Sequence, residues 1–528
     1  MHKEQKKRVT SKNELIPFMD TLERRYEAAC KATGEANWHS YAGGAHDLDS
    51  AKKLFADIFL DSALRKIILD WNNISGSLAD PLLARRLEMW KRCFIGGTVY
   101  SDPEISKQEN ALQKKITDFK LKLDTNLVTR AGIDSLLRVE RNQKKRHKIW
   151  AVTSQISKVT NKDLLKLVKL RNAKATAEGF PNYFSLSLYL QSVDEAWLLK
   201  TLNSLEQETR APFTDFITYA KKKFRIKTME PWDFNYVLNA TASLPDKYFP
   251  KDSVFSVIHR FESGIGFPVK SLPIKEVVKD IPYGGLSLAI QIPNDSRFLV
   301  NPTQGKGFYA TAFHEYGHSL KAVNTEAPYP ILKGYEWIPG AQCAAYEEGI
   351  AETHAEFTED SLWLTRFTKA KPKEIGKYIA GRNLPALYRL RRLLKDFFIE
   401  YEMYKNPNQD MAALECSMVK KYLLVDIDST EPHQFAASIW YTSYPCYYQN
   451  YILAAMISTQ LQEAMSSMFE EDKLSSPKVA AWMKQNLYAT GEEFEWMERI
   501  RDASGKELEP GAYLRKLGIE MSQPIHKD

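Results

Sequence analysis

Apolar residues recur at helical spacing along most of the chain. This spacing is found over residues 13–32, 47–72, 79–96, 104–128, 132–159, 161–177, 192–222, 374–405, 408–424, 451–471 and 476–488. Each segment predicts a helix, because apolar positions three and four residues apart lie on one helical face. Strands and helices do not alternate regularly, and no internal repeat is present. The pattern therefore predicts a predominantly all-α protein.

One stretch departs from helical spacing. Residues 286–293 alternate apolar and polar positions imperfectly and lie between turn-forming residues, and residues 297–300 follow as a second short apolar run. This pattern predicts a β-hairpin. Its first strand could pair with the backbone of an extended peptide. A purely structural hairpin is an equally good interpretation of these residues alone.

The most informative motif is HEYGH at residues 314–318. Two histidines four residues apart face one way on a helix and can bind one zinc ion, with the glutamate beside the metal. Two surface or capping histidines would produce the same pattern by chance. The surrounding residues 309–320 are rich in alanine, lack proline and have one apolar face, which favours a helix in the core.

A catalytic zinc ion needs a third protein ligand, and residues 346–357 offer one. Glu348 and Glu352 share a face of the predicted helix, so one could bind the metal while the other supports a ligand histidine. The alternative is a solvated acidic helix, because acidic residues are dense in this region. The HEYGH motif upstream makes the metal-binding interpretation the better one.

Residues 439–455, IWYTSYPCYYQNYILAA, form an aromatic segment. An aromatic stripe at helical spacing usually packs in a core. Tyr448 and Tyr451 are three residues apart, however, so we expect them to project from one helical face toward a shared point.

Together these segments resemble known peptidases. FHEYGHSL and EEGIAETHAEFTEDSLWL are similar to the zinc-binding core of two gluzincin groups, the angiotensin-converting-enzyme-like dipeptidyl carboxypeptidases and the thimet oligopeptidase/oligoendopeptidase group. PCYYQNYILA resembles the tyrosine signature of the oligoendopeptidases, and the matches run from about residue 165 to 465. The resemblance implies two helical halves around a deep substrate channel, with a small β-sheet next to the HExxH helix.

The resemblance also implies a ligand set. His314, His318 and Glu348 would bind one zinc ion per chain, and Glu352 would take the acidic position that supports a histidine. A shifted register would instead put Glu352 on the metal, with Glu359 following it as in the oligoendopeptidase branch. We prefer Glu348 because EGIAE resembles the glutamate-first pattern of the converting-enzyme-like branch.

Tyr451 and Tyr448 match the tyrosine pair that, in these families, donates hydrogen bonds to the substrate carbonyl as it becomes an oxyanion. The families also place a histidine shortly before the tyrosines. Here only His433 and, nearer, Tyr441 stand in that region, and we take both as candidate substrate-binding residues.

The resemblance favours the substrate-binding interpretation of the hairpin, for which Ala289 and Gln291 are the candidate contacts. It further implies an N-terminal helical half at 1–270, forming a channel wall or lid, and a catalytic zinc half at 271–528. In the families the halves exchange helices, so this boundary is approximate.

These residues predict a zinc-dependent hydrolase of short peptides, of the oligopeptidase or peptidyl-dipeptidase type. Zinc would acidify a water molecule and polarise the scissile carbonyl, while Glu315 would act as general base and then general acid. An aminopeptidase is disfavoured because no GxMEN-like sequence is present. A catalytically weak peptide-binding protein on the same scaffold would be expected to have lost Glu315 or a ligand histidine, and the chain retains them.

The amino-acid composition indicates what kind of protein this is and where in the cell it works. With 528 residues, of which 44% are hydrophobic, the chain can bury several cores, yet no stretch reaches the length that a membrane span requires. Its five cysteines are scattered and odd in number, which favours a reducing compartment, and no secretory signal precedes the first helix, so we expect a cytoplasmic protein. We expect a monomer or weak dimer.

Nucleic acid is not an expected partner. The net charge of +7 is modest for this length, and the basic run at 138–148 has no recognition motif beside it. An exposed helix face explains that run better. The expected partners are short peptide substrates.

Overall fold

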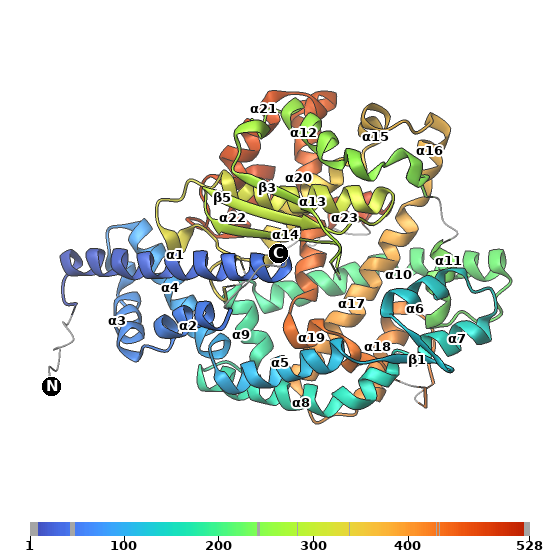
Figure 1. The fold of residues 1–528 in the computed structure, drawn as a ribbon, viewed down its shortest axis with the longest axis horizontal. Helices are drawn as coiled ribbons and strands as arrows, with labels where there is room; N and C mark the ends of the chain where they lie inside the picture. The colour runs from blue at the N-terminus through green and yellow to red at the C-terminus, as the bar shows by residue number, and fades with distance from the viewer. Residues whose placement is uncertain are drawn as a thin grey trace.

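The computed structural model describes residues 9–42, 48–239, 243–281, 283–336, 338–428, 430–431 and 433–521. Within these ranges the protein is mainly helical with small sheets, which confirms the predicted fold class (Figure 1). The α-helices are α1 Lys12–Ala42, α2 Leu48–Phe59, α3 Ser62–Asn72, α4 Pro81–Tyr100, α5 Pro103–Thr117, α6 Arg130–Val139, α7 Gln143–Ala151, α8 Ser154–Ala177, α9 Tyr183–Leu190, α10 Glu195–Phe224, α11 Phe234–Asn239, α12 Val254–Gly264, α13 Lys306–Val323, α14 Ala344–Phe357, α15 Ser361–Phe367, α16 Pro372–Gly381, α17 Asn383–Lys405, α18 Met411–Met418, α19 Trp440–Ser443, α20 Tyr448–Phe469, α21 Pro477–Met483, α22 Trp496–Ser504 and α23 Gly511–Lys516.

Several predicted helices are divided because polar residues cap new helices inside them. The segment predicted at 47–72 forms α2 and α3, since the Asp61 side chain accepts hydrogen bonds from two backbone amides of α3. The segment at 132–159 divides at Asn142, which caps α7 in the same way. The segment predicted at 104–128 ends at Thr117, and a two-stranded hairpin follows, β1 Leu121–Leu123 and β2 Asn126–Val128.

The predicted hairpin at 286–300 is confirmed, as part of a three-stranded sheet. It consists of β4 Gly285–Gln291 and β5 Asp295–Val300, which pair antiparallel with Gly285 opposite Val300 and Ser287 opposite Phe298. The sequence pattern did not predict the third strand, β3 Ile274–Val278, which pairs parallel with β5. The strand order β3-β5-β4 leaves β4 at an edge.

Helices cover both faces of this sheet. On one face lies α13, where the Ser287 and Ser319 hydroxyls are 3.2 Å apart. On the other face, Trp38 of α1 packs in a small core with Leu288 and Ile290. Figure 1 shows α1 extending away from the sheet, with its C-terminal end beside the strands. The sheet therefore forms a layer between the first helix of the chain and the HExxH helix.

The helix α14 packs against both α13 and α20 (Figure 1). Gly317, inside the HEYGH motif, makes the first of these contacts close, because a Cβ there would lie 2.9 Å from the Ala351 Cα. A larger residue would separate the two helices. This close packing brings the HEYGH face next to the acidic face of α14.

The N-terminal helices share a core with a segment more than two hundred residues away. Leu15, Trp90, Ile331 and Tyr335 belong to one buried cluster. The division into halves at 1–270 and 271–528 stays a prediction. All five cysteines are unpaired, and within the described ranges no helix is both long and apolar enough to cross a membrane.

Candidate metal centre

Two helices bring three possible metal ligands together. The Nε2 atoms of His314 and His318, both on α13, are 3.2 Å apart, and Glu348 Oε2 on α14 is 3.4 Å from His314 Nε2. Ligands about 2.0–2.1 Å from a tetrahedral zinc ion are separated from one another by about 3.3 Å. The two nitrogens and one oxygen therefore fit zinc in type, and the two distances from His314 Nε2 fit it in spacing, with all three atoms within 4.8 Å of one another.

The surroundings favour a cation. Besides Glu348, the carboxylate of Glu315 is buried in this region, whereas the buried Glu347 beside them is paired with Lys321. Burial and the neighbouring His314 lower the pKa of His318 to about 3, so its imidazole is neutral and able to bind a metal. Several buried carboxylates close together are unfavourable without compensating positive charge.

Glu352 lies on the other side of His314. Its Oε2 is 3.4 Å from His314 Nδ1, whereas Glu348 lies at Nε2. A carboxylate at Nδ1 can hold the imidazole proton on that nitrogen and leave Nε2 for a metal. The one-turn separation of the two glutamates thus puts them at opposite nitrogens of one ring.

Glu315, a residue of α13, is buried against the start of β4. A Cβ on Gly285 would lie 2.7 Å from Glu315 Oε1, so a side chain at that position would displace the carboxylate. Burial, together with the charge of Glu348, raises the pKa of Glu315 to about 7 against the opposing effect of His314. Near this pKa a carboxyl group can both accept and release a proton at neutral pH.

The aromatic segment contributes Tyr447 and Tyr451. The Tyr447 hydroxyl donates a hydrogen bond of 2.7 Å to Glu348 Oε1, the oxygen that does not face His314. The two tyrosine rings are 5.4 Å apart. Burial and the nearby charge of Glu348 raise the pKa of Tyr451, so it remains a hydrogen-bond donor.

The structure gives Tyr448 and Tyr451 different neighbours, and their predicted convergence on one point stays a prediction. The Tyr448 hydroxyl lies 3.1 Å from Ser438 Oγ, and its ring packs on Tyr441. Residues four apart are neighbours along one side of a helix just as residues three apart are, and Tyr447 lies directly before α20. The pair beside the metal ligands is therefore Tyr447 and Tyr451.

Tyr441 and His433 also lie apart from the three ligands. The Tyr441 hydroxyl donates to the Asp396 carbonyl at 3.0 Å, and the side chain is buried. The His433 ring stacks on Phe435 with centroids 5.6 Å apart. Both residues therefore have protein partners, and their contact with substrate stays a prediction.

Ala289 and Gln291 occupy the half of β4 that is farther from Glu315. Gln291 lies six residues beyond Gly285, about 20 Å along an extended strand. Its side-chain oxygen accepts a hydrogen bond of 3.1 Å from Lys31 of α1, and Ala289 packs on the N-terminal core. The part of β4 beside Glu315 begins instead at Gly285.

Sequence reasoning missed three residues of this region: Tyr447, Arg389 and Glu336. Arg389 on α17 has a half-exposed side chain, 3.7 Å from Glu352. Glu336 Oε1 is 3.5 Å from His318 Nδ1. Tyr447 stands in the quoted aromatic segment and could have been found there, whereas no local pattern distinguishes Arg389 or Glu336 from other charged residues.

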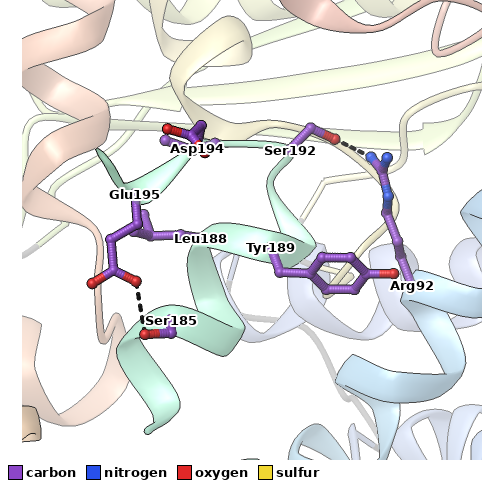
Figure 2. Close-up of a pocket in the computed structure, with 8 residues that line it drawn as sticks. Arg92, Ser185, Leu188, Tyr189, Ser192, Asp194 and Glu195 are labelled. Carbon is purple, nitrogen blue, oxygen red and sulfur yellow. Dashed lines mark hydrogen bonds between the residues drawn. The ribbon is translucent and has the colours of Figure 1, made fainter. Parts of the chain in front are cut away.

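A separate cavity of about 360 Å³ contains none of the predicted site residues (Figure 2). Figure 2 shows Arg92 directed at Ser192, and Glu195 at Ser185. Arg92 also forms ion pairs with Glu88 and Glu495. Because the charged groups that line this cavity already have protein partners, it is a weaker candidate than the histidine cluster.

Comparisons with known proteins bear on the fold and on the C-terminal segment. Residues 407–521 match the model of the carboxypeptidase Taq (M32) metallopeptidase family. A search of the curated proteins finds no match. The matched segment includes the tyrosines but not HEYGH, so the match and the motif are separate observations.

Solved structures share the fold over nearly the whole chain. Trypanosoma cruzi metallocarboxypeptidase 1 is 14% identical with a TM-score of 0.63, and 96% of this chain and 98% of that chain are covered. A protein assigned as an oligoendopeptidase F is 16% identical with a TM-score of 0.68, with coverage of 97% and 92%. Pyrococcus furiosus carboxypeptidase is 11% identical with a TM-score of 0.64, with coverage of 97% and 99%.

The resemblance drawn from sequence included the oligoendopeptidases but did not name the M32 family. The likeness to the converting-enzyme-like and thimet oligopeptidase groups stays a prediction. The family match in the C-terminal segment, taken with the HEYGH helix, identifies the chain as a zinc metallopeptidase, a hydrolase of peptide bonds.

Proposed function

We propose that this enzyme binds one zinc ion per chain through His314, His318 and Glu348 and hydrolyses short peptides. The observation that carries the proposal is the convergence of three donor atoms within 4.8 Å of one another on two packed helices. When bound there, zinc would supply Lewis-acid chemistry, activating water and polarising the scissile carbonyl.

Glu315 is the proposed proton carrier. It would accept a proton from the attacking water and then deliver that proton to the leaving amine. Its burial beside Gly285 supports this role, because the carboxylate has a fixed position and a raised pKa. The backbone of β4 from Gly285 onward is the proposed site for an extended peptide, since this edge strand begins next to Glu315.

The proposal is tested by metal analysis of the purified protein together with hydrolysis of a mixed pool of peptides, followed by mass spectrometry. One zinc ion per chain and time-dependent cleavage are expected. Zinc without cleavage would favour a peptide-binding protein on this scaffold. The masses of the products identify removal of single residues, of dipeptides or of internal fragments.

Tyr451 is expected to act on the substrate carbonyl. Replacing it with phenylalanine should lower kcat by about a hundredfold to a thousandfold with little change in KM, as for loss of one oxyanion donor. The reason is that such a hydrogen bond strengthens mainly in the transition state. Steady-state kinetics on one peptide measures both constants.

Tyr448→Phe is the matched control for this prediction. It removes the same hydroxyl three residues earlier, where the group contacts Ser438 instead of the metal ligands. Its kcat should remain within a few-fold of the parent enzyme. An equal decrease in both variants, or no decrease in Tyr451→Phe, would contradict the assignment of Tyr451.

For the mode of cleavage we propose removal of residues from the C-terminal end. Arg389 supports this proposal. Its guanidinium has one ion pair among the described residues, the 3.7 Å contact with Glu352, and the side chain is 52% exposed. A guanidinium binds a carboxylate through two parallel hydrogen bonds, and a peptide has one free α-carboxylate at its C-terminus.

Arg389→Gln is therefore expected to lower kcat/KM for a peptide with a free C-terminus by about tenfold to a hundredfold. The reason is that hydrogen bonds to a charged group contribute about 1.5–3 kcal/mol, and the variant loses them. The same peptide with an amidated C-terminus should be a poor substrate of the parent enzyme and should lose nothing further in the variant. Kinetics on the two peptides measures the difference.

Arg392→Gln serves as the control for Arg389→Gln. It removes an exposed arginine from the same helix that already pairs with Asp396. Its kcat/KM should match the parent value on both peptides. Equal cleavage of the free and amidated peptides by the parent enzyme would exclude the carboxylate anchor and favour an oligoendopeptidase, as the PCYYQNYILA resemblance suggests. Release of dipeptides would favour the peptidyl-dipeptidase type.

A further inference from the structure

A second charged group lies behind the metal centre, on the far side of His318. Ligand atoms of His318, Glu336 and Glu347 lie within 4.8 Å of one another. His318 Nδ1 is buried and makes no hydrogen bond with the residues that the structure describes, and Glu336 Oε1 is 3.5 Å from it. A small approach of these two atoms would form a hydrogen bond.

The other carboxylate of this group already has a cation. Lys321, one turn after His318 on α13, lies 2.7 Å from Glu347 Oε1, and both side chains are buried. A buried ion pair is costly to separate, so Glu347 is committed to Lys321. Glu336 is then the carboxylate left to interact with His318.

Two residues close before Glu336 are held by side-chain contacts with α1 and with the turn after β4. Lys333 Nζ lies 2.5 Å from Glu27 of α1, and the Tyr335 hydroxyl donates to the same carboxylate at 3.3 Å. The Ile292 amide donates to the Tyr335 oxygen at 3.1 Å. These contacts hold the segment in place, so Glu336 has a defined position relative to His318.

We propose that Glu336 is a positioning residue for His318. The inference rests on the proposed function, in which His318 binds zinc through Nε2. An imidazole presents Nε2 to a metal only when its proton is on Nδ1, and an oxygen acceptor at Nδ1 fixes both the proton and the ring orientation. Glu336 supplies that acceptor.

Each of the two histidines then has one carboxylate oxygen near its Nδ1 atom. His314 has Glu352 Oε2 at 3.4 Å from Nδ1, and His318 has Glu336 Oε1 at 3.5 Å from Nδ1. The two carboxylates come from different parts of the chain, since Glu352 is on α14 and Glu336 is in the segment that precedes it. Each ligand histidine is thus held by one carboxylate that does not bind the metal.

The test is the zinc dissociation constant of Glu336→Ala, measured by competition with a chromophoric chelator. Loss of the acceptor should weaken zinc binding by about 10- to 100-fold, the usual effect of removing such a partner. Glu336→Gln retains an oxygen acceptor and should bind zinc more tightly than Glu336→Ala. The melting temperature of the metal-free form should fall little in either variant.

Glu23→Ala is the matched control. Glu23 is a buried carboxylate on α1 that binds Arg86 and Trp90, so its removal should lower the melting temperature and leave the zinc dissociation constant unchanged. An unchanged zinc dissociation constant in Glu336→Ala would overturn the proposal, whatever its melting temperature.

Two further outcomes of the same measurements are informative. Two zinc ions in the parent protein and one in Glu336→Ala would also overturn the proposal, because Glu336 would then be a ligand of a second metal. If the parent protein binds no zinc, the proposed function itself fails. Zinc binding by the parent with equal affinity in Glu336→Ala removes only the positioning role.

Discussion

Glu315→Gln is expected to retain zinc, to bind peptide with near-normal affinity, and to lower kcat by about a hundredfold to ten-thousandfold, the usual contribution of a general base. Glutamine preserves the shape of the side chain beside Gly285 but cannot accept the proton of the attacking water. The three ligand side chains are unchanged, so zinc should stay bound. Metal analysis, peptide-binding calorimetry and kinetics on one substrate measure the three expected quantities.

Glu326→Gln is a suitable control because it removes an exposed carboxylate just beyond the end of the same helix. Its kcat should equal that of the parent enzyme. Turnover of Glu315→Gln near the parent value would remove Glu315 from the mechanism. A loss of zinc in Glu315→Gln would show that the substitution disturbs the metal centre. The proton-transfer role would then be tested by measuring kcat of the variant after it is reloaded with zinc.

Local patterns were sufficient for the elements that carry the metal centre. The HEYGH helix and the acidic helix were predicted from spacing, because their apolar and metal-binding positions recur every three or four residues. The hairpin of β4 and β5 was also predicted. The strand β3 was missed because its sequence, IKEVV, lacks a clear alternation, and its pairing with β5 is a long-range contact.

The tertiary structure was needed to assign a role to one of two similar residues that lie one position or one helical turn apart. Glu348 and Glu352 share a face of α14, so spacing alone left both as ligand candidates; the approach of α13 decides which nitrogen of His314 each one meets. Tyr447 and Tyr448 differ by one residue, yet only Tyr447 contacts Glu348. The helix α20 begins at Tyr448, so Tyr447 lies just before it, and the aromatic pattern could not locate this boundary.

The roles of Glu336 and Arg389 could not be predicted from the sequence. Glu336 approaches His318, and Arg389 approaches Glu352, from separate parts of the chain. Glu336 precedes α14 in an irregular segment, and Arg389 lies on a helix rich in arginine. A charged side chain in such a setting is normally solvated. Only the folded chain distinguishes these two from the others.

The choice of carboxylate leads to the other large expected effect. Glu348→Ala should lose zinc and activity together, because the side chain is one of only three proposed protein ligands. Glu352→Ala should keep zinc with about 10- to 100-fold weaker affinity, since it contacts the outer nitrogen of His314.

Zinc content after dialysis against a weak chelator and kcat on one peptide separate these variants, with far-UV circular dichroism as the check that both remain helical. His318→Ala is the positive control, because it removes an imidazole whose Nε2 is 3.2 Å from that of His314. It should behave as Glu348→Ala does. If Glu348→Ala kept full zinc and activity while Glu352→Ala lost both, the metal would have to lie on the opposite side of the His314 ring. The proposed positions of Glu315 and Tyr451 relative to the substrate would then be wrong as well.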